Sequence, residues 1–165
     1  MQVRHVISLL AISMVLGFVP VTNAQQLGTK EELDKKFFEF SAKKAKILSG
    51  EESATDKSLK PIAEGVSQYF IYRITHRTTI DPGKVQADFN NQLAPAFDKK
   101  IVEKKKRPFI DLLAPELVKC MTEVLDRDIK GDPSTVIHAA QMLPTMAKLR
   151  HPAINAYLIE LIGDA

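Results

Sequence analysis

Residues 133–162 read PSTVIHAAQMLPTMAKLRHPAINAYLIELI, and the spacing of their apolar residues is helical. Apolar side chains recur every three or four positions in residues 136–147 and again in residues 154–162, which is the period of a helix with one buried face. The dipeptide His151-Pro152 separates the two series, and proline is well suited to the first turn of a helix. The stretch therefore predicts two helices joined by a tight turn.

The same period extends upstream, where the first two helices are predicted. Thr29 and Glu32 have the spacing of a capping box, and Gly50 supplies a stop for the helix that follows them. A second apolar series begins at Ile62 and continues into the Thr78-Thr79 region. We expect one helix over each series, with a short acidic linker between them.

Prolines mark the third and fourth helices. Asp81-Pro82 opens the third, because the aspartate accepts hydrogen bonds from free backbone donors and the proline is preset for the first helical position. Apolar positions continue this helix to Ile101, and Pro95 bends or splits it. Arg107-Pro108 opens the fourth helix, which bends at Pro115. No alternating segment of useful length interrupts these series, so the fold class is all-α with successive helices as antiparallel neighbours.

A weak internal repeat links the two ends of this helical region. When Pro108 is aligned with Pro152, an offset of 44 residues, Leu117 superposes on Leu161 and other apolar positions also match. Helical-hairpin repeats have periods of about this length. The offset predicts that the chain from Pro108 onward is built from related helical pairs.

Residues 133–164 resemble the short form of the HEAT-like repeat family. In that form a helix with a small-residue pair, here Ala139-Ala140, leads through a turn containing proline into an apolar helix that ends here at Leu161-Ile162-Gly163-Asp164. Ile137 departs from the pattern, which often has an arginine there. The resemblance implies a right-handed stack of hairpins over residues 108–165 that binds proteins. Residues 25–107 match only as helical pairs, so a helical cap or an irregular bundle stays open there.

The first 24 residues have the pattern of a secretory signal. A basic start at Arg4 precedes an uncharged run over residues 6–19, and small residues lead up to Ala24. The run is shorter than the roughly 20 residues of a membrane-spanning helix. We expect cleavage after Ala24, no transmembrane segment in the mature protein, and one helical domain over residues 25–165 in a periplasmic or extracellular location.

Composition narrows the functional class further. Residues 25–165 carry 22 basic and 20 acidic residues because only Arg4 is lost, and this net charge of +2 is too small to imply a nucleic-acid partner. Cys120 is the only cysteine, so no disulfide can form within the chain. A buried thiol that packs as an apolar group is one interpretation of Cys120, and an intermolecular disulfide is the other.

One basic cluster stands out. Its six cations, opposed only by Glu103, are Lys99, Lys100, Lys104, Lys105, Lys106 and Arg107. Such a cluster can bind an anionic polymer, a phospholipid surface or an acidic protein, or it can be a solvated helix end. No aromatic residue interleaves with the lysines, which argues against a platform for single-stranded nucleic acid.

The densest aromatic cluster lies in the second predicted helix. Tyr69 and Arg73 share one face of this helix, whereas Phe70 and Ile74 share another. Core packing is one interpretation, and an exposed tyrosine and arginine pair that contacts a partner is the other.

The histidines do not form a recognisable site. His76 is expected to end the second helix, and His138 and His151 are expected at the surface, with His138 beside Thr145 on the polar side of its helix. The motifs of covalent haem, of zinc proteases and of serine hydrolases are absent. The sequence therefore predicts no catalytic residue, no metal and no cofactor.

The last predicted helix is almost entirely apolar. Glu160 is its only charged residue, and its large apolar residues are Ile154, Tyr157, Leu158, Ile159, Leu161 and Ile162. A helix at the end of a repeat array needs a cover for its outer side. We expect Tyr157, Leu158 and Ile162 to contact a protein partner or a second copy, unless the chain is the front portion of a longer repeat protein.

These features predict an exported, non-catalytic helical-repeat scaffold that binds a protein partner. Two alternatives from other classes stay open. One is a small exported helical enzyme or cofactor carrier whose site is assembled from scattered side chains, and the other is an envelope-associated anion-binding protein that uses Lys99–Arg107.

Overall fold

The computed structural model describes residues 28–52, 57–76, 81–97, 108–128 and 133–163. Within these ranges the chain contains six α-helices, one short 3-10 helix and no strand, which confirms the all-α class. The elements are α1 (Lys30–Ser49), α2 (Leu59–Thr75), α3 (Pro82–Leu93), η1 (Ala94–Phe97), α5 (Pro108–Asp128), α6 (Pro133–Ala147) and α7 (Pro152–Gly163). None of the described helices is both long and apolar enough to cross a membrane.

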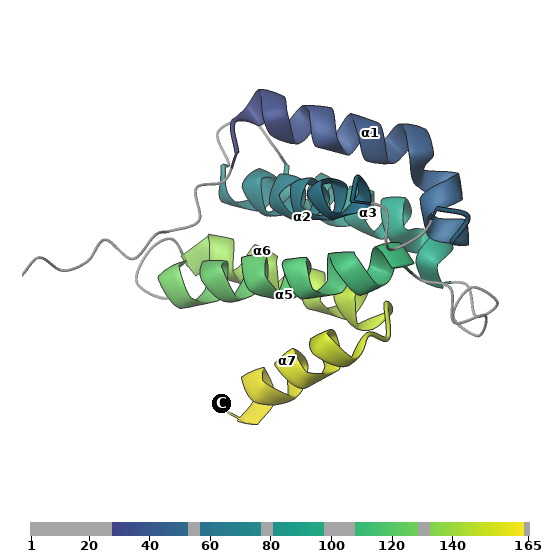
Figure 1. The fold of residues 1–165 in the computed structure, drawn as a ribbon. Coiled ribbons are helices and arrows are strands. Elements are labelled where there is room, and N and C mark those ends of the chain that lie inside the picture. The colour runs from purple at the N-terminus through teal and green to yellow at the C-terminus, as the bar shows by residue number, and fades with distance from the viewer. Residues whose placement is uncertain (1–27, 53–56, 77–80, 98–107, 129–132, 164–165) are drawn as a thin grey trace, which may run out of the picture.

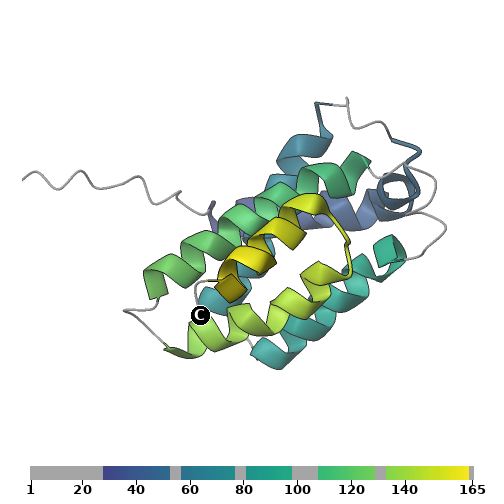
Figure 2. The same ribbon diagram turned by 90° about the horizontal axis from the view of Figure 1, so that it is seen from below.

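The helices are arranged in successive layers (Figure 1). Helix α1 covers one side of α2, helices α5 and α6 lie beyond α2 and α3, and α7 forms the layer farthest from α1. Figure 2 shows α7 lying along α5 on the outside of the molecule. Helix α5 packs against α1, α2, α6 and α7, and α2 packs against α1, α3, α5 and α6, so these two helices lie at the centre of the fold.

Both ends of α1 form as the sequence predicts. The Thr29 hydroxyl accepts a hydrogen bond from the Glu32 backbone N–H at 3.3 Å, and the Glu32 carboxylate accepts one from the Thr29 N–H at 2.9 Å. Gly50 ends the helix with a φ of 76°, and its N–H donates to the Ile47 carbonyl. This left-handed backbone favours glycine, which has no Cβ to clash.

Other predicted boundaries differ from the structure. Helix α2 ends at Thr75 with His76 as its C-cap, so it does not extend through the described residues toward Thr78-Thr79. Helix α3 stops at Leu93, and the chain tightens into the 3-10 turn η1 around Pro95, because proline lacks the N–H that would continue an α-helix. The predicted continuation to Ile101 lies outside the described residues.

Phenylalanines from four helices join the layers. Phe40 of α1 stacks on Phe109 of α5 with 5.2 Å between ring centroids, and Phe70 of α2 meets Phe89 of α3 edge-to-face at 4.8 Å. All four side chains are fully buried. Aromatic rings bury the largest apolar area per residue, so these contacts stabilise the packing of α1, α2, α3 and α5.

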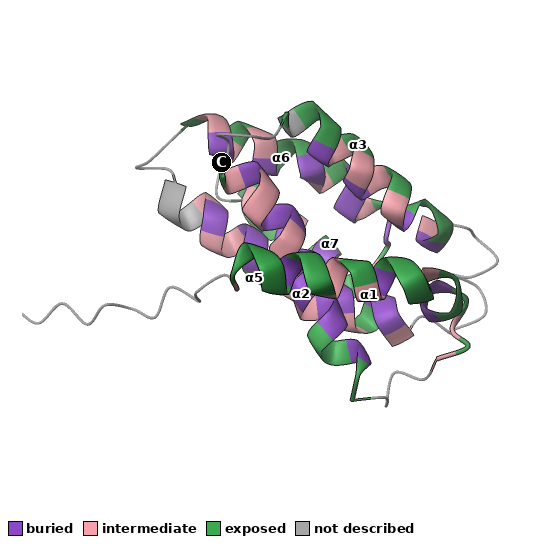
Figure 3. Ribbon diagram, turned by 90° about the horizontal axis from the view of Figure 1, so that it is seen from above, coloured by how far each residue is buried: buried purple, intermediate pink, exposed green. Residues whose placement is uncertain are grey.

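The buried face of α6 coincides only in part with the predicted apolar stripe. Thr145, expected on the polar side with His138, is buried, whereas Ala140, expected on the apolar stripe, is exposed. The buried positions of the helix are Thr135, Ala139, Met142, Thr145 and Met146. Because α6 contacts α2, α3, α5 and α7, its buried face is set by neighbours on several sides and includes two threonines. Figure 3 shows this burial along α6 and the exposed outer side of α1.

Candidate functional site

An aromatic and charged cluster lies between the start of α1 and the end of α2. Phe37 of α1 and Tyr69 of α2 stack with 4.1 Å between ring centroids and 10° between ring planes. The guanidinium carbon of Arg73 lies 5.4 Å from the centroid of the Tyr69 ring. A guanidinium at this distance is attracted by the electron-rich face of the ring. We call Phe37, Tyr69 and Arg73 the Tyr69–Arg73 cluster.

Arg73 also joins α2 to α3. Its Nη1 donates to Asp88 Oδ2 at 2.9 Å, and the Arg73 side chain is only 16% exposed whereas the Asp88 side chain is 48% exposed. Burial and the neighbouring ring hold the guanidinium in one orientation. The sequence brought Tyr69 and Arg73 together, but it gave no signal for Asp88 because that contact depends on how α3 packs against α2.

The electrostatic environment of Tyr69 follows from this packing. Its pKa is raised, mainly because burial disfavours the charged phenolate, and the positive charge of Arg73 opposes part of that rise. Tyr69 therefore stays protonated near neutral pH. Its hydroxyl is a neutral polar group at the edge of the cluster.

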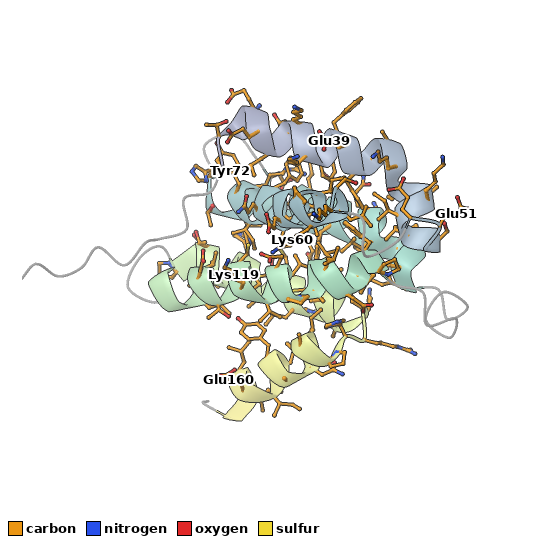
Figure 4. The ribbon with its side chains drawn as sticks, in the orientation of Figure 1. Glu39, Glu51, Lys60, Tyr72, Lys119 and Glu160 are labelled. Atoms are coloured by element: carbon orange, nitrogen blue, oxygen red, sulfur yellow. The ribbon has the colours of Figure 1, made fainter. Side chains whose placement is uncertain are left out.

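A small pocket borders the cluster. Its volume is about 240 Å³, and its lining residues are Lys30, Leu33, Asp34, Tyr69, Tyr72 and Arg73. Figure 4 shows Tyr72 at the end of α2, close to the first turns of α1. The Tyr72 ring stacks on His76 with 3.9 Å between ring centroids. Two tyrosines therefore line the pocket, and each stacks on another ring, Tyr69 on Phe37 and Tyr72 on His76.

The outer face of α7 is the second candidate. Ile154 and Tyr157 are buried, and Leu158 and Leu161 are partly buried against the core. The remaining large apolar residues, Ile159 and Ile162, are 71% and 78% exposed. Three positions separate them, so they share one side of the helix.

Tyr157 does not belong to this exposed face, so the prediction from the sequence that it contacts a partner is wrong. Its side chain is only 6% exposed, because that side of α7 packs against α5 and α6. Leu158 is half-buried and forms the border between the core and the outer face, and Ile162 lies fully on the outer face.

Two other exposed apolar residues were not identified from the sequence. Phe38 on the outer side of α1 is 73% exposed, and Ile137 on α6 is also exposed. Phe38 directly follows Phe37, which is partly buried against the core. A strict helical wheel anchored on Leu33 and Phe40 would have placed Phe38 on the outer side.

The basic cluster lies outside the described residues. Lys99, Lys100, Lys104, Lys105, Lys106 and Arg107 fall within residues 98–107, and the predicted signal falls within residues 1–27.

Cys120 is buried in α5, as its apolar stripe predicts. Burial raises its pKa from the ordinary 9.0 to about 12, because the thiolate would lose its water shell. The thiol is therefore protonated near neutral pH. Burial outweighs the opposing positive charge of Lys119, so this environment disfavours the nucleophilic thiolate.

The described histidines have structural contacts. His76 caps α2, as predicted, and its backbone N–H donates to the Tyr72 carbonyl. His138 Nδ1 lies 3.2 Å from the Gln141 side-chain oxygen. His151 was expected at the surface, but its side chain is largely buried: its Nδ1 accepts from the Ala153 N–H at 3.2 Å and its Nε2 lies 3.6 Å from Asp111. No set of three His, Cys, Asp or Glu side chains among the described residues is arranged to hold a metal ion.

Comparison with known proteins identifies no family for this chain. No protein-family model matches the chain, and neither a curated protein nor a solved structure is significantly similar to it.

Proposed function

We propose that this protein is an exported, non-catalytic helical scaffold that binds a protein partner through the outer face of α7. The observation that carries the proposal is the exposure of Ile159 and Ile162 on one side of the helix. Exposed apolar side chains that lie together on a surface mark interaction sites, because covering them removes apolar area from water.

The charge of α7 favours a protein over a membrane as the occupant. Glu160 is the only charged residue between Pro152 and Gly163, and the helix has no lysine or arginine. Helices that bind anionic lipid surfaces use basic side chains, and a carboxylate would be repelled there. An apolar helix or groove on another protein suits Ile159 and Ile162, which have the i, i+3 spacing of helix-in-groove recognition.

The packing of α7 on α5 supports the HEAT-like part of the proposal. These two helices are the ones whose sequences superpose at an offset of 44 residues, and they contact each other directly. Equivalent helices of neighbouring hairpins contact each other in stacked repeats. Such stacks present extended surfaces to their partners.

Export is the remaining part of the proposal, and the pattern of residues 1–24 supports it. We expect the mature protein to begin at Gln25. N-terminal sequencing of protein from the exporting host tests this, and an intact Met1 on soluble cytoplasmic protein would contradict it.

Substitutions on α7 test the docking surface. Ile159→Lys and Ile162→Lys should each weaken the retention of a partner at least about tenfold, because a lysine must then be desolvated in an apolar contact. Phe38→Lys is the matched control, since Phe38 is similarly exposed but lies on α1. Crosslinking in the exporting compartment followed by affinity measurement with the purified partner gives the readout. Equal loss in the control, or no loss in the α7 variants, would contradict the proposal.

Two measurements separate this proposal from the alternatives. A metal or a chromophore bound to the purified protein, detected by elemental analysis and an absorption spectrum, would favour an enzyme or cofactor carrier. Strongly salt-dependent retention on heparin or anionic vesicles would favour an anion-binding protein that uses Lys99–Arg107.

A further inference from the structure

The pocket at the start of α1 is separate from the outer face of α7. It is lined by residues of α1 and α2, whereas α7 lies in the layer farthest from α1 (Figure 1). Figure 4 shows the same separation, with Tyr72 beside α1 and Glu160 on α7. A ligand of this pocket can therefore be tested independently of the function proposed above.

We infer that this pocket binds a small aromatic carboxylate, with Arg73 as the residue that holds the carboxylate group. Three features of the pocket support this assignment: the orientation of Arg73, the net charge of the lining, and the two tyrosines.

The guanidinium of Arg73 is held in place without a ligand. Asp88 engages its Nη1 at 2.9 Å, and the Tyr69 ring lies 5.4 Å from its guanidinium carbon. A guanidinium has five N–H donors in one plane. The contact with Asp88 uses one nitrogen, so N–H groups remain for a ligand even with the Tyr69 side chain as a second partner of Arg73. Because Arg73 also lines the pocket and is largely buried, a carboxylate could be bound there by two parallel hydrogen bonds in partly desolvated surroundings.

The charges of the lining favour a single negative charge. Lys30 and Arg73 are cationic and Asp34 is anionic, so the lining carries a net charge of +1. Lys30 Nζ is 2.9 Å from Asp34 Oδ2, but both side chains are well exposed, and such pairs on a helix surface contribute little stability. The Lys30 ammonium can therefore turn toward a ligand at low cost. Asp34 would repel the second charge of a phosphate ester.

The remaining walls suit an aromatic ring. Phe37 stacks on one face of the Tyr69 ring and Arg73 lies over the ring, so Tyr69 contributes its edge to the pocket. Tyr72 stacks on His76, and Leu33 adds an apolar side chain to the lining. Ring supports of this kind hold the tyrosines in place, so little side-chain freedom is lost on binding. The volume of about 240 Å³ is smaller than that of common drug-sized pockets, which favours an acid with one ring over a nucleotide.

Benzoate is the probe for a direct test, and benzamide is its neutral counterpart. Fluorotyrosine labelling of the purified protein gives three ¹⁹F signals, because the chain has three tyrosines. We expect benzoate to shift the signals of Tyr69 and Tyr72 in a saturable manner and to leave that of Tyr157 unchanged. Benzamide and inorganic phosphate should bind at least about tenfold more weakly, since each lacks part of the complementarity.

Variants locate the binding determinants. Arg73→Lys keeps the charge but loses the planar pair of donors, so the Kd for benzoate should rise about tenfold or more. Lys30→Ala is the variant that leaves the fold intact, because the Lys30 side chain is exposed, and it should weaken benzoate binding a few-fold. Lys35→Ala is its control, an exposed lysine of α1 outside the pocket lining, and should change nothing.

The inference is overturned if benzoate causes no saturable shift in the wild-type protein, or if benzamide or phosphate binds as tightly as benzoate. It is also overturned if Lys30→Ala and Lys35→Ala have equal effects, because the Lys30 ammonium would then not contribute to the site.

Discussion

Gly65 of α2 lies directly against Lys36 of α1. A Cβ atom built on Gly65 would be 2.3 Å from Lys36 Cβ and 2.6 Å from its Cγ, closer than side chains approach one another. The missing side chain therefore sets how closely α1 and α2 pack. This close approach helps to position α1 against α2, and with it the pocket lined by Lys30 and Tyr69.

The substitution Gly65→Ala should destabilise the protein. Alanine is better than glycine in a helix by about 1 kcal/mol, but overpacking against Lys36 costs about 1–3 kcal/mol and separates two helices. We expect a net loss of about 1 kcal/mol in the free energy of unfolding, measured by urea melts. Gly163→Ala is the control, since nothing lies within 4 Å of its added Cβ. If Gly65→Ala instead raised the free energy of unfolding, α1 would be able to move away from α2 without a loss of packing energy, which would contradict this prediction.

Leu117→Ala should cost about 2–5 kcal/mol in the free energy of unfolding, because Leu117 is fully buried in α5 and the change leaves a cavity in the hydrophobic core. Lys119→Ala on the same helix removes an exposed side chain and should change the free energy by about 0.5 kcal/mol or less. Denaturant melts of both variants provide the measurement, and equal losses would mean that the buried face of α5 is assigned wrongly.

Asp88→Asn should destabilise the contact between α2 and α3. The variant leaves the largely buried guanidinium of Arg73 without its carboxylate, and we expect a loss of about 1 kcal/mol in the free energy of unfolding, reduced by the partial exposure of Asp88. Asp34→Asn removes an exposed pair with Lys30 and serves as the control, with an expected change of about 0.5 kcal/mol or less. Thermal melts that show no difference between the two would contradict the role of Arg73 as a link.

Cys120 should resist thiol reagents in the native protein. With its pKa at about 12, the thiolate fraction at pH 8 is negligible, and burial also blocks access. Labelling with a chromogenic disulfide reagent should be slow in buffer and rapid in urea.

Cys120 should also make stability depend on pH. Because the pKa of its thiol in the folded protein lies above the value in the unfolded chain, the contribution of this group to the free energy of unfolding is complete below pH 9 and is lost as pH rises toward 12. A Cys120→Ala variant should lack this part of the alkaline loss, and rapid native labelling would contradict the burial.

Local sequence was sufficient for several features of this protein. The capping pair Thr29 and Glu32, the stop at Gly50 and the start at Asp81-Pro82 all appear in the structure as predicted. Each depends on hydrogen bonds or backbone angles within one turn of chain, so neighbouring residues determine the outcome. The helical period of the apolar residues likewise predicted the all-α class, because the period is a property of each helix alone.

The arrangement of the helices determined what local patterns could not. The burial of Thr145, Tyr157 and His151 depends on which helices cover α6 and α7, and the pairing of Arg73 with Asp88 depends on the packing of α3 against α2. These contacts join residues that are distant in sequence or lie on different helices, and a sequence period specifies an apolar stripe but not its neighbour. The exposure of Ile159 and Ile162 follows for the same reason: most large residues of α7 are apolar, and the positions of α5 and α6 distinguish the covered side from the open one.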